Sequence, residues 1–371
     1  MSNFYLKTKI VTDAEADRAL AELKGCRIWI GCDGFLTQNP TVLSMISQLK
    51  SKNQVLLYSD IVPEPPIEKV AAGVASVAAF HPSLILAIGG GSAIDTAKAV
   101  RYFAEKKYGM TIDKFYAMPT TSGTGSEVTN IAVVSDTKEA IKYPLSADQL
   151  TPDMALLKSE LSVTCPPSVT AFSGMDVLTH ALEALVAKGA NGFSDALAEK
   201  AVEMVFAYLP ACYTEGNNLQ NRSLMHEASC IAGCAFQNAG LGITHSLAHQ
   251  IGSLYHIPHG LATSLLLPHV VRYNAGESAC LKKYARLARK IRISDWEASD
   301  ETSVERLVQA VIRLSRMLHC PQTLTEFGVQ KKAIAEKLGV IVEKAMQDFT
   351  FKGNPIEPTK EDLVRIILAI V

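Results

Sequence analysis

The feature that most constrains the fold is a regular alternation of short apolar runs and amphipathic stretches in the first half of the chain. We expect strands at residues 4–11, 27–32, 54–58, 84–88, 115–118 and 154–157, helices at 14–23, 42–50, 67–80 and 93–105, and a hairpin over 130–145. Such repetition predicts an α/β unit with a mostly parallel sheet and helices on both faces. After Pro166-Pro167 the strand signal disappears and helical patterning continues. We therefore expect an α/β domain over residues 1–163 and an all-helical domain over residues 164–371.

Two loops of small residues follow neighbouring strands of this predicted sheet. The run at 83–88 passes into Gly89-Gly90-Gly91-Ser92 before a helix, and the strand at 115–118 passes into a Thr, Ser and Gly loop over 119–129. Free N–H groups at a helix N-terminus attract a pyrophosphate, and glycine lets the backbone approach it. The glycine run at residues 89–91 lacks the Gly-x-Gly-x-x-Gly pattern, and a simple tight turn without a ligand would also explain these glycines. Two such loops at successive strand ends favour one dinucleotide crevice.

Two helix-spaced pairs of polar residues in the second half indicate a metal site. Asp176 and His180 are four residues apart, as are His245 and His249, and His259 follows soon after. Residues with this spacing share one face of a helix, so each pair can hold one ion. Taken singly, either pair is explained as a surface or capping pair. Together, an aspartate and three histidines among small residues predict a divalent cation, Fe²⁺ or Zn²⁺ before Mg²⁺.

Composition excludes several classes of function. The net charge of −1 and the absence of a basic run with interleaved aromatic residues give no reason to expect nucleic-acid binding. No apolar run reaches the roughly 18 residues that a membrane helix needs. The eight cysteines form no Cys-x-x-Cys pair and no signal-peptide pattern precedes them. We therefore expect a reduced, cytoplasmic setting.

The chain resembles the iron-containing, or group III, alcohol dehydrogenases over nearly all of its length. The matching motifs are Gly89-Gly90-Gly91-Ser92-Ala93-Ile94-Asp95, Pro119-Thr120-Thr121-Ser122-Gly123-Thr124-Gly125-Ser126-Glu127, Gly174-Met175-Asp176-Val177-Leu178-Thr179-His180-Ala181, His245-Ser246-Leu247-Ala248-His249 and Pro258-His259-Gly260. Within the family it is most similar to the propanol dehydrogenases of propanediol-utilisation microcompartments, on residues 28–36 and 141–145. The resemblance implies a dehydroquinate synthase-like architecture, with an N-terminal dinucleotide-binding domain and a helical metal-binding domain.

The resemblance also implies roles for individual residues. Four of them would hold the metal, with Fe²⁺ expected and Zn²⁺ left open: Asp176, His180, His245 and His259. The expected contacts with NAD(H) come from Asp33, Gly90, Gly91, Ser92, Asp95, Thr120, Thr121, Thr124, Thr129 and Lys142. An acidic side chain at Asp33 would accept hydrogen bonds from the adenosine ribose and repel a 2′-phosphate, which favours NAD over NADP. Lys142 is equally well explained as a solvated surface lysine.

The function implied is the interconversion of short primary alcohols and aldehydes, such as 1-propanol and propanal. The ion would act as a Lewis acid on the substrate oxygen while hydride passes between the nicotinamide and the carbinol carbon. We take His249 as a catalytic proton relay. The alternative is that His249 only orients a metal ligand.

Two other functions stay open at this point. One is a polyol dehydrogenase of the same superfamily, similar to glycerol dehydrogenase, and the other is a non-catalytic scaffold of a microcompartment. The complete ligand set argues against the scaffold. We further expect a homodimer formed through the N-terminal edge strand, and a microcompartment shell protein or an aldehyde dehydrogenase as a partner.

Overall fold

The computed structural model describes residues 4–136 and 141–371, which form two compact units. The first unit contains Tyr5–Cys165 and Gly216–Gly233. The second contains Pro166–Glu215 and Cys234–Val371, together with Phe4. The domain limits expected from the sequence, 1–163 and 164–371, remain a prediction. The units differ from them because residues 216–233 group with the first unit, and helical periodicity shows which face is buried but not which element covers it.

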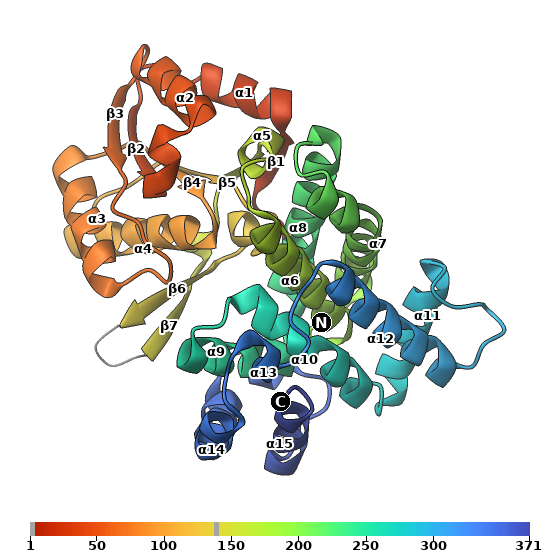
Figure 1. Ribbon diagram of the computed structural model, residues 1–371. Helices are drawn as coiled ribbons and strands as arrows, with labels where there is room; N and C mark the ends of the chain where they lie inside the picture. The colour runs from red at the N-terminus through yellow and green to blue at the C-terminus, as the bar shows by residue number, and fades with distance from the viewer. Residues whose placement is uncertain (1–3, 137–140) are drawn as a thin grey trace. The chain divides into compact units, whose positions relative to one another are not determined.

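A six-stranded parallel sheet forms the centre of the first unit (Figure 1). Its strand order is β1-β8-β5-β4-β2-β3. The strands are β1 Lys9–Thr12, β2 Arg27–Cys32, β3 Gln54–Tyr58, β4 Leu84–Gly89, β5 Lys114–Pro119 and β8 Met154–Leu157. The predicted parallel sheet is confirmed. The N-terminal strand lies at the sheet edge as expected, although it is shorter than the predicted 4–11.

Helices cover both faces of this sheet because successive side chains of a strand point to opposite sides. Leu84, Leu86 and Ile88 of β4 lie in one core, whereas Ile85 and Ala87 lie in another. The first core also contains residues of α1 and α2, and the second contains residues of α3 and α4. These helices are α1 Asp13–Ala21, α2 Pro40–Lys50, α3 Ile67–Phe80 and α4 Gly91–Tyr108.

Shorter elements follow the strands at their carboxyl ends. The short helix η1 (Gly34–Gln38) follows β2, and η2 (Ser126–Val128) lies after β5. The predicted hairpin is present as antiparallel strands β6 (Ile131–Asp136) and β7 (Ile141–Ser146). The last short elements before the helical part are η3 Asp148–Leu150 and α5 Ser159–Ser162.

The second unit is helical, as predicted. Its helices are α6 Pro167–Val186, α7 Gly192–Thr214, α9 Ile243–Tyr255, α10 His259–Asn274, α11 Ser278–Lys290, α12 Asp300–Met317, α13 Leu324–Phe327, α14 Lys331–Gln347, η4 Phe351–Gly353 and α15 Lys360–Leu368. Helix α8 (Leu219–Ala239) begins in the first unit and ends in the second. Helix α6 packs against α7 and α10 and is buried continuously from Gly174 to Val186. Among the described helices, none combines the length and apolarity needed to cross a bilayer.

Candidate metal centre and dinucleotide turn

Three helices of the second unit bring the predicted metal ligands together. Helix α6 carries Asp176 and His180 one turn apart, α9 carries His245, and α10 begins at His259. One carboxylate oxygen of Asp176, Oδ1, lies 3.8 Å from His245 Nε2 and 3.6 Å from His259 Nε2, and its Oδ2 lies 3.9 Å from His180 Nε2. Because metal–ligand bonds to nitrogen and oxygen are about 2.0–2.2 Å long, one ion fits among these atoms.

A buried histidine nitrogen without a hydrogen bond supports the fit of a cation in this cluster. His245 is 2 % exposed, and its Nε2 has no hydrogen-bond partner among the residues that the structure describes. Burying an imidazole nitrogen without a hydrogen bond destabilises the fold unless a ligand binds that nitrogen. Asp176, His180 and His245 are buried, and the atoms that they offer lie within 4.8 Å of one another. His259 is the more exposed member, with 40 % of its side chain accessible.

The charges of this cluster match the protonation states that a divalent ion requires. Burial raises the pKa of Asp176, but His180, His259 and His245 and the Thr263 hydroxyl at 3.1 Å outweigh it and hold the pKa below its usual range. Burial, reinforced by His180, holds the pKa of His245 well below its ordinary value. The centre therefore presents an anionic carboxylate and a neutral imidazole at neutral pH, as metal ligation needs.

Two acidic residues behind the histidines were not anticipated from the sequence. Glu183 Oε2 lies 2.6 Å from His245 Nδ1, and Asp348 Oδ2 lies 2.8 Å from His249 Nδ1. Glu183 could have been suspected because it is a third ionisable residue, three positions after His180, on an otherwise apolar helix. No local signal marks Asp348, which is 99 residues from its partner.

Aromatic rings flank the imidazoles. Phe236 stacks on His180 with ring centroids 4.5 Å apart, and Phe349 stacks on His249 at 5.7 Å. The His249 ring also stacks on His259 at 5.4 Å. Histidine 249 thus lies beside the cluster, in contact with a predicted ligand.

In the first unit, the glycine turn lies between β4 and α4 as predicted. Gly89 has φ 153°, and α4 begins two residues later at Gly91. Asp33, at the end of β2, accepts the Gly90 N–H at 3.0 Å through Oδ2. A Cβ at Gly89 would lie 2.3 Å from that oxygen, so only glycine allows the approach. Burial raises the pKa of Asp33, and the Gly90 N–H opposes that rise.

The loop after β5 returns to the same turn. A Cβ at Gly91 would lie 2.7 Å from Cγ2 of Thr124, and one at Gly90 would lie 3.6 Å from Oγ1 of Thr121. Thr120 is buried, and its N–H donates to the carbonyl of Gly89 at 3.0 Å. The structure therefore brings both predicted loops to one end of the sheet.

Four further predicted cofactor residues remain, and the side chains of two of them are already engaged in contacts within the first unit. Asp95 accepts Ser126 Oγ at 2.6 Å and the Val133 N–H at 3.0 Å, and Thr129 Oγ1 receives Lys98 Nζ at 3.0 Å. Both side chains therefore hold the loop and the hairpin onto α4. A role in contacting a dinucleotide stays a prediction for both.

The remaining two differ in how far they can be described. The Ser92 hydroxyl, in the first turn of α4, accepts the Glu64 N–H at 3.3 Å. Lys142 lies in β7 opposite Ser135, but its side chain lies outside what the structure describes.

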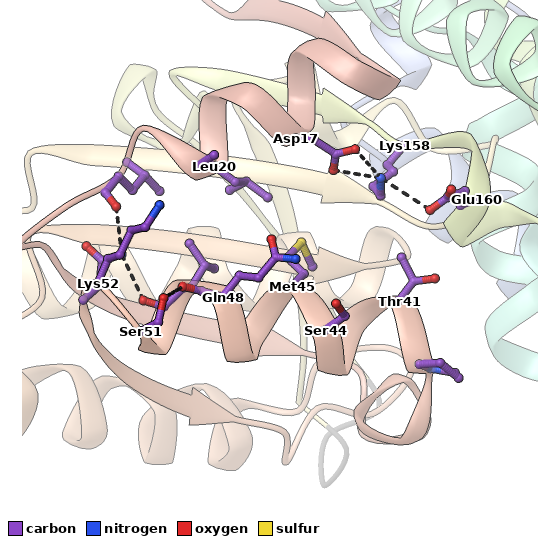
Figure 2. Close-up of a pocket in the computed structure, with 15 residues that line it drawn as sticks. Asp17, Leu20, Thr41, Ser44, Met45, Gln48, Ser51, Lys52, Lys158 and Glu160 are labelled. Atoms are coloured by element: carbon purple, nitrogen blue, oxygen red, sulfur yellow. Dashed lines mark hydrogen bonds and ion pairs between the residues drawn. The ribbon is translucent and has the colours of Figure 1, made fainter.

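A separate pocket of ≈ 730 Å³ lies between α1 and α2 (Figure 2). Figure 2 shows Lys158 on one wall, paired with Asp17 at 2.8 Å and with Glu160 at 3.4 Å. The described residues that line this pocket include none of the predicted site residues. Because Lys158 is already paired with two carboxylates, its ammonium group is not available to an anionic ligand.

Comparison with known proteins places both units in one family. A family profile described as iron-containing alcohol dehydrogenase matches residues 8–159. A second, described as the C-terminal part of the Fe-containing alcohol dehydrogenase family, matches residues 170–371. Together the two profiles account for nearly the whole chain.

Curated relatives and solved structures agree with the profiles. The 1-propanol dehydrogenase PduQ of Citrobacter freundii is 42% identical over 355 residues, covering 96% of each chain. The NADPH-dependent butanol dehydrogenase of Clostridium saccharobutylicum is 40% identical over 327 residues, covering 84% of this chain and 83% of the relative.

Among solved structures, 1,3-propanediol oxidoreductase aligns over 100% of both chains with a TM-score of 0.92 and 29% identity. Sulfoacetaldehyde reductase from Bifidobacterium kashiwanohense in complex with NAD⁺ aligns over 100% of this chain and 98% of its own, with a TM-score of 0.87 and 26% identity. The chain belongs to the iron-containing alcohol dehydrogenase family.

Proposed function

We propose that this alcohol dehydrogenase interconverts short primary alcohols and aldehydes, with 1-propanol and propanal as the reference pair, in a metal-dependent and NAD(H)-linked reaction. The observation that carries the proposal is the convergence of three histidines on Asp176. The two relatives compared above are named for propanol and for butanol. A small apolar alcohol suits the aromatic rings of Phe236 and Phe349 that flank the cluster.

The metal we propose is Fe²⁺, bound by Asp176, His180, His245 and His259. Three imidazoles and one carboxylate suit both Fe²⁺ and Zn²⁺, so the ligand set alone allows either ion. The description of the family favours iron.

The dinucleotide we propose is NAD(H), bound at the turn formed by Gly89, Gly90 and Gly91. The half-buried carboxylate of Asp33 beside this turn would accept hydrogen bonds from the ribose hydroxyls and disfavour a 2′-phosphate. One relative is NADPH-dependent by name, whereas one structural neighbour is a complex with NAD⁺. The proposal therefore requires a direct comparison of the two dinucleotides.

When bound, the ion supplies a Lewis acid for the substrate oxygen and the dinucleotide supplies or accepts the hydride. His249 is the proposed proton relay. Its Nδ1–H donates to Asp348 Oδ2 at 2.8 Å, which leaves Nε2 to exchange a proton with the substrate hydroxyl or with solvent. Asp348 is itself fixed by the N–H and hydroxyl of Thr350, at 2.9 and 2.7 Å.

Anaerobic reconstitution tests the proposal. Metal-stripped protein is reloaded with Fe²⁺ or Zn²⁺, and NADH and NADPH oxidation are followed with C2 to C4 aldehydes and with dihydroxyacetone. We expect propanal reduction with NADH to return only with metal. Turnover that survives chelation would refute the metal role, and a preference for dihydroxyacetone would replace the proposed substrate class by polyols.

Self-association is proposed through β1, the edge strand of the sheet. Among the described strands β1 pairs with β8 alone, so its other edge can accept a strand from a second copy. Ile10 in β1, and Tyr5 and Leu6 just before it, expose large apolar side chains. Sedimentation analysis checks for the expected homodimer. Encapsulation in a microcompartment, with a shell protein or an aldehyde dehydrogenase as partner, and a cytoplasmic location are further proposals that rest on the resemblance.

A further inference from the structure

Glu183 lies on α6, seven residues after Asp176 and three after His180, so all three share one face of the helix. Its carboxylate is 3 % exposed and accepts three donors from the start of α9. These are the Gly242 N–H at 3.1 Å, the Thr244 N–H at 2.7 Å and the Nδ1–H of His245 at 2.6 Å. A single buried side chain therefore connects the helix of two predicted ligands to the helix of a third.

The contact with His245 determines which nitrogen of that ring carries the proton. Because an ionised carboxylate only accepts hydrogen bonds, Glu183 in that state pairs with an N–H at Nδ1 of His245 through the short contact. The lone pair of Nε2 is then free, and this atom lies 3.8 Å from Asp176 Oδ1. The unpartnered nitrogen noted above is thus the one that the tautomer makes available for a cation.

We propose that Glu183 is a positioning residue that holds His245 in the Nε2-ligating tautomer and orientation, and so sets the affinity of the centre for its divalent cation. This inference rests on the proposed metal-dependent function. A carboxylate hydrogen-bonded to the distal nitrogen of a ligating histidine fixes the ring and increases its basicity, and loss of such a partner typically costs 10–100-fold in metal affinity.

The competing explanation is that Glu183 only caps α9. It satisfies two backbone N–H groups of the first turn, and Asn354 Oδ1 accepts a third, from Ile243 at 3.3 Å. A Cβ at Gly242 would lie 2.6 Å from Asn354 Oδ1 and 3.0 Å from Glu183 Oε1. Glycine is therefore required for this double cap. Asn354 shares the capping role of Glu183, but its hydrogen bonds join it to Ile243, Asn274 and Ile356, which makes it a matched control.

The experiment compares Glu183→Gln with Asn354→Ala. A glutamine amide keeps one acceptor oxygen and replaces the other by a donor, so it cannot serve all three donors. We expect Zn²⁺ affinity, measured by chelator competition on stripped protein, to fall by about 10–100-fold in Glu183→Gln. At a fixed excess of Zn²⁺, the stabilisation of the loaded over the stripped protein should then shrink by about 1.4–2.7 kcal/mol.

Asn354→Ala should lower the melting temperatures of the stripped and the loaded protein alike and leave Zn²⁺ affinity near that of the wild type. If Glu183→Gln behaves in the same way, Glu183 is a capping residue only and the inference is overturned. If Glu183→Gln does not fold, Glu183→Asp, which retracts the carboxylate by one methylene, is measured with the same expected loss. Wild-type protein that binds no Zn²⁺ or Fe²⁺ would instead refute the proposed function, so the two failures are distinct.

Discussion

Gly260 provides a quantitative test of how closely the helices that carry the predicted metal ligands must approach. It follows His259 at the start of α10, where α10 packs on α6. A Cβ at this position would lie 2.1 Å from the carbonyl oxygen of Phe172, 2.6 Å from its carbonyl carbon and 3.3 Å from Cβ of Asp176. The obstacle is main chain of α6, which cannot rotate away as a side chain could.

In Gly260→Ala the two helices must therefore separate by about 1 Å before the new Cβ and the Phe172 carbonyl reach ordinary contact distance, since a packed interior has no empty space to take up the methyl group. Overpacking of this kind costs about 1–3 kcal/mol. This exceeds the roughly 0.5–1 kcal/mol by which alanine favours a helix over glycine. The same movement displaces His259 relative to Asp176, and a misplacement of about 1 Å can reduce activity about 100-fold.

The assay is thermal unfolding of the stripped protein together with Zn²⁺ affinity and propanal turnover of the loaded protein. Gly339→Ala is the control, because Gly339 lies in α14 and, among residues 4–136 and 141–371, an added Cβ there meets no heavy atom within 4 Å beyond its own helix backbone. It should be neutral or stabilising by up to about 1 kcal/mol. If Gly260→Ala melts no lower than Gly339→Ala and binds Zn²⁺ like the wild type, the packing argument is refuted.

Three other changes test the charged groups. Asp348→Asn should lower kcat by about 10²-fold or more and alter the pH profile of kcat. If Asp348 and His249 act as one relay, adding His249→Ala should lower kcat little further, and NADH affinity should stay at the wild-type value in both variants. Lys98→Met should lower the free energy of unfolding by about 3–5 kcal/mol in urea denaturation and weaken NADH binding, because it leaves the half-buried Asp95 and the buried Glu127 without the cation beside them. Wild-type values for both would contradict the anchoring role. Burial raises the pKa of Glu127 from 4.5 to about 7, so the folded state retains a proton that the unfolded chain releases, and stability falls as pH rises through that window. Glu127→Gln should remove this decline between pH 5 and pH 8, and an unaltered decline would exclude Glu127 as its source.

Local spacing was sufficient to pick out side chains that the structure brings together in the candidate metal cluster. Asp176 with His180, and His245 with His249, are pairs within one helix, and their separation along the helix depends only on its pitch. The alternation of strands and helices predicted the parallel sheet for a similar reason, because strand and helix periods are properties of short segments. Charged partners far apart in the chain have no such signal.

The sequence by itself determined the alternating strands and helices of the first half, the helical character of the second, and that Asp176 and His180 share a helix turn. Only the tertiary structure decided that Glu183 meets His245, that Asp348 meets His249, and that Lys98 anchors Thr129. The physical reason is that periodicity encodes the direction in which a side chain points, whereas the identity of its neighbour depends on how distant segments pack. A buried carboxylate is tolerated only where such a neighbour is present, so the partners emerge from packing and not from spacing.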